Sequence, residues 1–594
     1  MPDCRTVTDV PRSDAPPDAA AGLHQTHRRR TRPWRTHPHR THPRRTRLHR
    51  EALLATAAGI LLACTLRLPV LRSLTTGLPE DLGDPLLQAW QLAWGQHALR
   101  TQPLSPFDAN TFWPLEDSLA FSDSLLGYAP LGLLLGEGAG AVVLRYNVVF
   151  LLTYALAFTG AYALVRQLGA SPAAGAVSGL AFAYAPWHLA QEGHLQILST
   201  GGIPLTLALL ARGHGYGRPG PVKPALVLAG WAVGAWQVTI GFGLGLQFGY
   251  LLGAVTVVYA AVWLAGRRAA VPRRLAVAEV TGMVGFLVVA GLFALPYLGV
   301  ADRHPEAERS VADLELFSPP ATAFITAPED SLLYGDRQSG VREELSFPPE
   351  MTLAVGGALV VLAAAGLTAG RWPRRRRLGL AAAVLLLLVL AMGTQAPGGG
   401  RFSYLLLFDH APGWQGIRTP GRLVVPMTLG LALLAATGLD RIRESLGSGR
   451  AASAVSVLAL LVVGLETLGT TPVLPAPQVP AALEQAEGPV LVLPSAEIAD
   501  LRAMFFSSAA LYPLVNGYSG FTPDELTELR LAVAGFPDPA SVELLRQTGV
   551  RTVVLLPGEA GGTPWAGAEA IPVDGLPLAR REMGEAVVFE LRPP

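Results

Sequence analysis

Long apolar segments, separated by short polar ones, make up most of the 594-residue chain. Each is close to the roughly 20 residues that an α-helix needs to cross about 30 Å of hydrocarbon. The pattern predicts an all-α polytopic membrane domain with about eleven transmembrane helices. The predicted spans are 52–72, 143–165, 172–189, 195–212, 224–240, 243–265, 276–298, 351–370, 378–394, 422–440 and 452–470.

One further apolar segment, 125–142, is interrupted by Pro130 and several glycines. We interpret it as a re-entrant or interfacial helix. Counting it as a span would move every later arginine cluster to the opposite side of the membrane, against the excess of Lys and Arg expected in cytoplasmic loops.

The composition supports a membrane protein, since half of the residues are hydrophobic and only 15% are charged. A single soluble domain of this length would carry far more charge. The two cysteines, Cys4 and Cys64, offer neither a disulfide framework nor a zinc-type cluster.

Arginine placement gives the predicted orientation. Residues 1–50 are rich in Arg, His, Thr and Pro, so we predict a disordered basic cytoplasmic tail. Such a run can bind nucleic acid, but it lacks aromatic interleaving apart from Trp34, and we predict no nucleic-acid partner. The later arginines fall on the same side as the tail, which places the N-terminus in the cytoplasm and the C-terminal domain outside the cell membrane. They are Arg166, Arg212, Arg218, Arg267, Arg268, Arg273, Arg274, Arg371, Arg374 to Arg377, Arg441, Arg443 and Arg450.

The predicted domains are therefore the tail, a transmembrane domain at 51–470, and a small extracytoplasmic C-terminal α/β domain at 471–594. The transmembrane domain has outer loops at 75–142, 299–350 and 395–421. Short apolar strands beginning at Val490, Thr552 and Ala586, with helical patterns at 522–534 and 540–547, indicate the α/β domain.

The first outer loop is acidic and carries the candidate catalytic residues. Asp84 precedes a predicted helix in which Trp90 and Trp94 lie four residues apart, typical of an amphipathic helix in the membrane interface. Asp84 would then be held at the membrane surface as a base for an acceptor hydroxyl. The alternative is that Asp84 only caps the helix. Asp81 is a second candidate for the same role.

Two further positions offer polar groups outside the membrane. Asp123 is either a second carboxylate of the same site or a helix cap. Glu192 and His194, in a turn between two spans, are candidates to hold a sugar or a phosphate, although a lone histidine there is more often structural. No second histidine has metal-ligand spacing, so we predict no metal site and no cofactor; a divalent metal is possible but is not supported by ligand spacing.

Arginines in the third outer loop are unusual, because they lie outside against the expected bias. Arg418 and Arg422 are candidates to bind a phosphate through paired hydrogen bonds, with snorkelling to the interface as the alternative. Glu344 is a candidate partner for one of them, or a solvated loop charge. The chain contains no phosphate-binding glycine loop, dinucleotide fingerprint or nucleophile elbow.

Several short motifs give the chain a family resemblance. It resembles the GT-C superfamily of polytopic membrane glycosyltransferases, which transfer sugars from polyprenyl-phosphate carriers, and in particular uncharacterised bacterial members. In that family an acidic residue of the first outer loop is the usual base, and Asp84 and Asp81 match its position. The motifs are Gly83-Asp84-Pro85, the Trp90/Trp94 helix, Phe112-Trp113-Pro114, Phe121-Ser122-Asp123, Ala183-Tyr184-Ala185-Pro186-Trp187, His194-Leu195-Gln196, Glu344-Leu345-Ser346-Phe347-Pro348 and Gly416-Ile417-Arg418-Thr419-Pro420-Gly421-Arg422, with Val515-Asn516-Gly517-Tyr518-Ser519-Gly520-Phe521 in the C-terminal domain.

The resemblance implies a membrane glycosyltransferase of hexosyltransferase type. It would move a sugar from a polyprenyl-phosphate sugar donor to an extracytoplasmic glycan, lipid or protein acceptor. Two alternatives remain: a non-enzymatic lipid or glycan transporter, and a glycan-binding membrane scaffold. A transporter would show internal inverted repeats and acidic residues within spans; no repeat is evident, and Glu279 and Glu466 lie near span ends.

Overall fold

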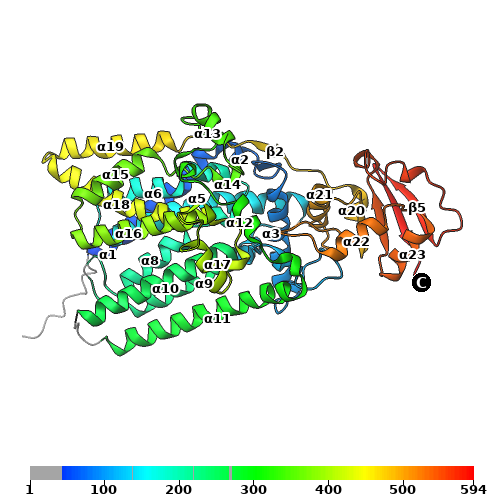
Figure 1. Cartoon of the computed structure of the whole chain (residues 1–594), viewed down its shortest axis with the longest axis horizontal. Helices are drawn as coiled ribbons and strands as arrows, with labels where there is room; N and C mark the ends of the chain where they lie inside the picture. Colours follow the sequence, from blue (N-terminus) through cyan, green and yellow to red (C-terminus); the bar gives the residue numbers. More distant parts are fainter. Residues whose placement is uncertain (1–42, 137, 219, 267–270) are drawn as a thin grey trace, which may run out of the picture. The chain divides into compact units, whose positions relative to one another are not determined.

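A computed structural model describes residues 43–136, 138–218, 220–266 and 271–594 (Figure 1). The predicted tail at 1–42 and the pair Arg267–Arg268 lie outside the described residues. Residues Arg50–Pro594 form one compact unit.

Helices occupy all eleven predicted spans, although some of the helices are short or broken. In six cases the helix is long and apolar enough to cross a membrane. The chain is thus a membrane protein, and the number eleven stays a prediction. The helices are α1 (Pro43–Leu66) with α2 (Leu68–Arg72), α5 (Ala139–Gln167), α6 (Pro172–Ala183), α7 (Leu195–Leu198) with α8 (Gly202–Gly213), α9 (Pro224–Ile240), α10 (Phe242–Ala265), α11 (Arg273–Arg303), α15 (Gly357–Ala369), α16 (Arg374–Ala391), α18 (Val424–Ser445) and α19 (Gly449–Glu466).

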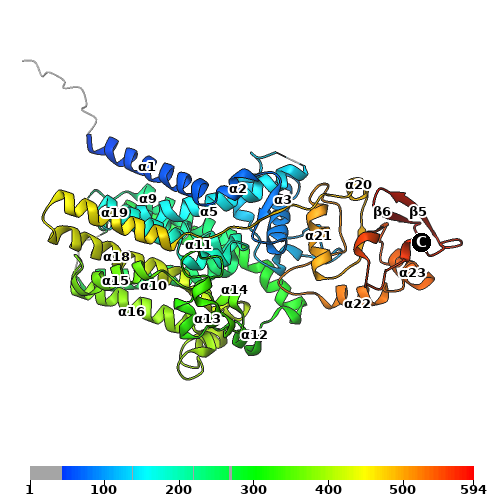
Figure 2. The same cartoon turned by 90° about the horizontal axis from the view of Figure 1, so that it is seen from above.

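The helices of the bundle differ in how deeply they are buried, and α1 runs along one edge (Figure 2). In α18, 83% of the apolar stretch is buried, because α6, α15 and α16 pack around this helix. In α10 and in α11 only 11% of the apolar stretch is buried, so their apolar side chains face outward. A helix that is apolar on an exposed face is stable in lipid, which supports the membrane assignment.

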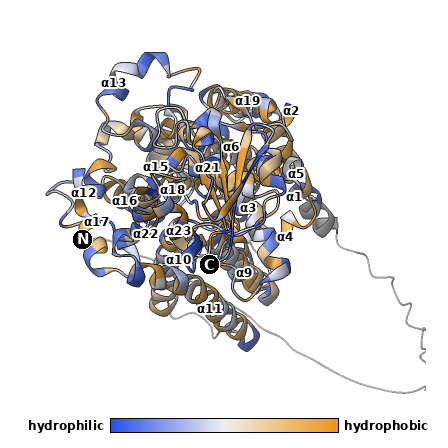
Figure 3. Cartoon of the chain, turned by 90° about the vertical axis from the view of Figure 1, so that its right-hand side faces the viewer, coloured by the Kyte–Doolittle hydropathy of each residue, from blue (hydrophilic) through white to orange (hydrophobic). Residues whose placement is uncertain are grey.

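Short helices fill the outer loops. The segment 125–142 forms only brief helical turns before α5, so it is not a span, as predicted, and it is not a continuous interfacial helix either. Polar residues gather at α13 (Figure 3). The short helices are η1 (Ser118–Phe121), η2 (Leu126–Tyr128), α4 (Ala129–Gly132), η3 (Pro186–Gln191), η4 (Pro305–Ala307), α12 (Val311–Leu316), η5 (Ala321–Ile325), η6 (Asp336–Gln338), α13 (Ser339–Glu343), α14 (Pro348–Met351), η7 (Gly393–Gln395), α17 (Tyr404–His410), η8 (Trp414–Gly416) and η9 (Pro420–Leu423).

Helix α3 (Asp84–Thr101) does not lie on a lipid surface, so this prediction was wrong. Trp90 and Trp94 are 2% and 3% exposed. Their indole N–H groups donate to Asn110 Oδ1 at 3.0 Å and to the Pro106 carbonyl at 2.9 Å. The helix packs against α5 and against α21 (Glu497–Ser507) of the C-terminal region. Tryptophans four residues apart can pack against another part of the protein or lie among lipid headgroups, so their spacing alone does not distinguish these two environments.

The C-terminal region contains a four-stranded sheet with the order β3-β4-β6-β5. Strands β3 (Val490–Leu493) and β4 (Thr552–Leu555) are parallel, while β6 (Ala586–Leu591) is antiparallel to both β4 and β5 (Leu578–Met583). Its helices are α20 (Ala481–Glu484), α21, α22 (Asp524–Ala532) and α23 (Pro539–Gln547), with η10 (Pro557–Glu559) and η11 (Ala568–Ala570).

This region is joined to the first outer loop by backbone pairing. Strand β1 (Gly77–Pro79) pairs antiparallel with β2 (Val473–Pro475). Further along, the Leu514 N–H donates to the Asn110 carbonyl at 2.6 Å, and the Leu514 carbonyl accepts from Trp113 N–H at 2.9 Å. The Phe112 N–H donates to the Asn516 carbonyl at 3.2 Å. The C-terminal region thus has a hydrophobic core of its own, which includes Leu493, Val553 and Phe589, and is tied to the first outer loop by backbone hydrogen bonds.

Candidate functional site

Asp84 and His194 form an ion pair at the start of α3. His194 Nε2 lies 3.2 Å from Asp84 Oδ2, and the two side chains are 22% and 33% exposed. Asp84 is the first residue of α3, and Asp81 Oδ1, just before the helix, accepts from the Gly83 N–H at 2.8 Å. The Asp84 carboxylate is thus turned toward the histidine rather than acting as the predicted helix cap.

The surrounding charges keep this pair ionised. Burial raises the pKa of the Asp84 carboxyl, but the hydrogen bond from His194 and the charges of Arg422 and Arg418 hold that pKa below its usual value. Burial lowers the pKa of His194, but its hydrogen bond to Asp84 and the charge of Glu350 raise it on balance. Each group therefore favours the charged form of the other, and both side chains are partly exposed.

Asp123 lies near the same charged groups, but its pKa is shifted in the opposite direction from that of Asp84. Its Oδ1 accepts from the Gly243 N–H at 3.1 Å, in the first turn of α10. Burial raises the pKa of Asp123, against the opposing effects of the backbone amides and of Arg422 and His194. Two carboxyl groups of one region thus have pKa values shifted in opposite directions, which is a frequent arrangement in sites that move protons.

Arg422 is held by Glu350, a residue that the sequence interpretation missed. Arg422 Nη2 lies 2.6 Å from Glu350 Oε1, and Glu350 is 7% exposed. Burial raises the pKa of Glu350, but the charges of Arg422 and His194 lower it on balance. The predicted partner, Glu344, is exposed, and no ion pair is described for it. The sequence carries no signal that separates Glu350 from Glu343 and Glu344, because all three lie in the same loop.

Arg418 is exposed, and its guanidinium lies 5.0 Å from the centre of the Phe317 ring. This cation–π contact fixes the side chain without neutralising it. The charge of Arg418 also acts on Asp84, so the two groups belong to one region. Burial, and after it the charge of Asp84, raise the pKa of the Tyr518 hydroxyl in the C-terminal region.

Glu192 occupies a separate, buried ion pair. Its Oε1 lies 2.5 Å from Arg67 Nε and accepts from the Tyr154 hydroxyl at 2.8 Å. Glu192 and Arg67 are 0% and 1% exposed. Trp90 is buried as well, and Asp81 is exposed at the chain turn before α3. Of the predicted residues, Asp84, Asp123, His194, Arg418 and Arg422 are therefore brought together, whereas Glu192 is buried in its own ion pair, Trp90 is buried in α3 and Glu344 is exposed.

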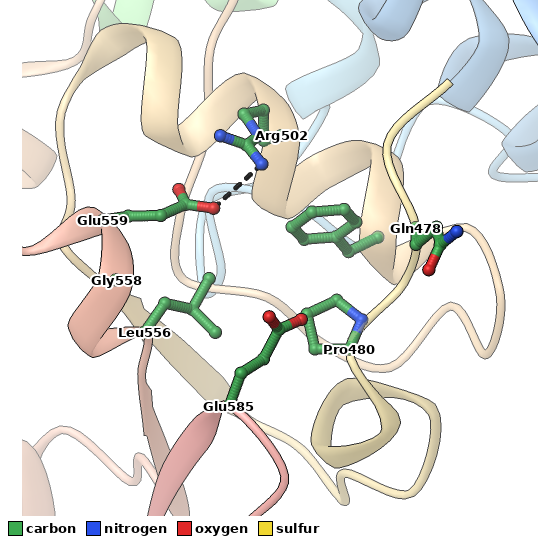
Figure 4. A pocket seen from close by; sticks show the side chains of 8 residues that line it. Gln478, Pro480, Arg502, Leu556, Gly558, Glu559 and Glu585 are labelled. Atoms are coloured by element: carbon green, nitrogen blue, oxygen red, sulfur yellow. Dashed lines mark ion pairs between the residues drawn. The ribbon is translucent and has the colours of Figure 1, made fainter. Parts of the chain in front are cut away.

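A cavity of about 280 Å³ lies within the C-terminal region and not at these residues (Figure 4). The Arg502–Glu559 ion pair, at 2.9 Å, forms one wall, and Glu585 lies across from it. None of the predicted site residues lines it. Among the described residues, one group of three potential ligands, His304, Glu306 and Glu525, has ligand atoms within 4.8 Å of one another, and it does not include Asp84 or Asp123.

Among known proteins, the chain matches several solved structures. No family model matches the chain, and no curated protein matches it. The helical bundle with this outer loop has the GT-C fold of polytopic membrane glycosyltransferases, so the predicted resemblance is confirmed at the level of the fold.

The arabinofuranosyltransferase AftD from Mycobacteria shares this fold at a TM-score of 0.52 and 17% identity, over 92% of this chain. A mutant form of AftD gives a TM-score of 0.54, also at 17% identity and over 92% of this chain. The chain spans only 40% of the length of the AftD chain. An oligosaccharyltransferase from Archaeoglobus fulgidus matches 85% of this chain and 68% of its own, at 13% identity and a TM-score of 0.45, too low to carry an argument.

Proposed function

We propose that this chain is a membrane glycosyltransferase that moves a sugar from a polyprenyl-phosphate carrier to an extracytoplasmic glycan, lipid or protein acceptor. The observation that carries the proposal is the Asp84 carboxylate, kept ionised by His194 and two arginines while one third of its side chain stays exposed. The GT-C fold supports the reaction class by analogy.

The reaction would invert the anomeric carbon in one displacement. The acceptor oxygen attacks the anomeric carbon, the bond from that carbon to the phosphate oxygen breaks, and its electron pair leaves on the phosphate. Asp84 takes the acceptor proton as the new bond forms, when that proton is most acidic; this compensates for the modest basicity of a carboxylate with a lowered pKa. Arg422 and Arg418 would stabilise the phosphate that departs.

Three further residues would support the reaction. His194 orients the Asp84 carboxylate and maintains its charge. Asp123, whose pKa is raised, would hold a proton and donate a hydrogen bond to a sugar hydroxyl. Tyr518 would border the acceptor path, which gives the C-terminal region a role in acceptor choice.

The test compares Asp84→Asn with Asp81→Asn in the purified full chain, reconstituted in lipid. Asp81 is three residues away, exposed and equally charged, so it is a matched control. With a panel of polyprenyl-phosphate sugars and a glycan acceptor, we expect kcat to fall about 10²- to 10⁴-fold for Asp84→Asn and less than about twofold for Asp81→Asn. Full activity of a correctly inserted Asp84→Asn protein would exclude Asp84 as the base. Accumulated lipid-linked sugar in a deletion strain would identify the donor.

A further inference from the structure

Three potential metal ligands converge where the membrane part meets the C-terminal region. His304 ends α11, Glu306 lies in η4, and Glu525 lies in the first turn of α22. One ligand atom from each lies within 4.8 Å of the others. His304 Nδ1 is 3.2 Å from Glu306 Oε1 and 3.9 Å from Glu525 Oε2.

The histidine is held in place before any ion binds. Its side chain is 5% exposed, and its ring packs edge-on against Phe121 and at a tilt against Phe521, with ring centres 5.3 and 5.8 Å away. The backbone N–H of His304 donates to the Val300 carbonyl at 2.8 Å, which holds the backbone at the end of α11. In this position the His304 Nδ1 atom lies next to both carboxylates.

A single proton links only two members of this group. The His304 Nδ1 atom carries at most one hydrogen, which can bond to Glu306 Oε1 at 3.2 Å, whereas Glu525 Oε2, at 3.9 Å, lies beyond hydrogen-bond reach. Glu306 also accepts from the Asp524 N–H, at 3.4 Å. No such second donor is described for Glu525, whose side chain is 58% exposed and free to rotate. A cation between the three atoms would neutralise both carboxylates together.

The distances fit a small divalent transition-metal ion. With bonds of about 2.0–2.1 Å, neighbouring ligands of tetrahedral zinc lie about 3.3 Å apart. The 3.2 Å separation matches this value, and a small rotation of the exposed Glu525 brings the 3.9 Å separation to it. One imidazole and two carboxylates suit Zn²⁺ or Mn²⁺, with water completing the shell.

We propose that His304, Glu306 and Glu525 bind one divalent transition-metal ion that fastens α22 to the end of α11. The ion stabilises the segment that leads into α22, whose Gly520 N–H donates to the Phe121 carbonyl at 3.2 Å. Phe121 is two residues from Asp123, so the ion lies close to the candidate site without belonging to it.

The test measures metal bound to the full chain in detergent, after chelation and buffer exchange. Zn²⁺ and Mn²⁺ are added separately, and bound metal is measured by mass spectrometry after gel filtration and by calorimetric titration. We expect one equivalent of at least one of the two ions, together with a rise in the thermal unfolding temperature. Glu525→Gln, at an exposed position that tolerates the change, should weaken binding at least tenfold and abolish the rise.

Glu528→Gln is the control, because Glu528 is an exposed acid on the same helix, and it should bind as the unaltered protein does. His304→Gln should behave as Glu525→Gln does. The proposal is overturned if neither ion binds at millimolar concentration. It is equally overturned if Glu525→Gln keeps the full stoichiometry and affinity, which would mean binding at unrelated surface groups.

Discussion

Replacing Glu192 with glutamine tests whether this residue stabilises the fold or binds substrate, as its position in the sequence first suggested. The change keeps the size of the side chain and its hydrogen bond from Tyr154 but leaves Arg67 with an unpaired charge at 1% exposure. Removing one partner of a buried ion pair costs about 3–5 kcal/mol. We expect the thermal unfolding temperature to fall by several degrees.

The assay is thermal unfolding of the purified protein in detergent, followed by intrinsic fluorescence, with transfer activity measured below the transition. Glu51→Gln is the control, because Glu51 pairs with Arg166 in a more exposed setting, where such a pair is worth roughly 0–1 kcal/mol. Replacing both Arg67 and Glu192 with methionine should cost less than Glu192→Gln, since no charge is left unpaired. An unchanged unfolding temperature for Glu192→Gln, together with lost activity, would refute the reasoning and return Glu192 to the substrate site.

Four further outcomes follow from the site and from α3. In His194→Gln, Asp84 loses the hydrogen bond that lowers its pKa, so the acid limb of the pH–rate profile should move to higher pH. An acid limb that does not move would contradict the pairing. In the unaltered protein, stability from the pair is lost as pH falls through the lowered pKa of Asp84 or rises through the raised pKa of His194, so pH scans of unfolding should show both losses. His194→Gln should lack the loss at high pH and show a smaller one at low pH, because Arg422 and Arg418 still lower the pKa of Asp84. Arg422→Met should raise the KM for donor and lower kcat, measured by initial rates, whereas an effect on the acceptor alone would argue against phosphate binding. Trp90→Phe leaves the Asn110 acceptor buried and unpaired and should cost about 1–3 kcal/mol of stability without changing the pH profile.

The positions of the helices were predictable because a membrane leaves a strong signature in sequence. Each span must be apolar for about 20 residues, whatever its neighbours are. The side of α3 that meets protein was not predictable, because Trp90 and Trp94 suit a lipid headgroup region and a packed interior alike. Burial against α21 depends on residues that follow about 400 positions later in the chain.

The candidate site shows the same division between local and long-range information. Asp84, His194 and Arg422 were identifiable one by one, because polar groups at the outer ends of apolar segments are uncommon. Their pairing was not, since nothing local links the end of one span to a loop far away. Glu350 was missed because the same loop also holds Glu343 and Glu344, and only the three-dimensional arrangement decides which carboxylate meets the arginine.

The pairing of the first outer loop with the C-terminal region has a consequence for synthesis. Asn110 donates to the Tyr512 carbonyl across 402 positions of sequence. At about 5–20 residues per second, a ribosome needs roughly 20–80 s to make the intervening chain. During that time the loop that carries Asp84 has been synthesised, but the C-terminal region that packs against it has not. A chain that stops before Leu514 never gains that partner, so even a late truncation should yield an inserted protein with an unfinished site.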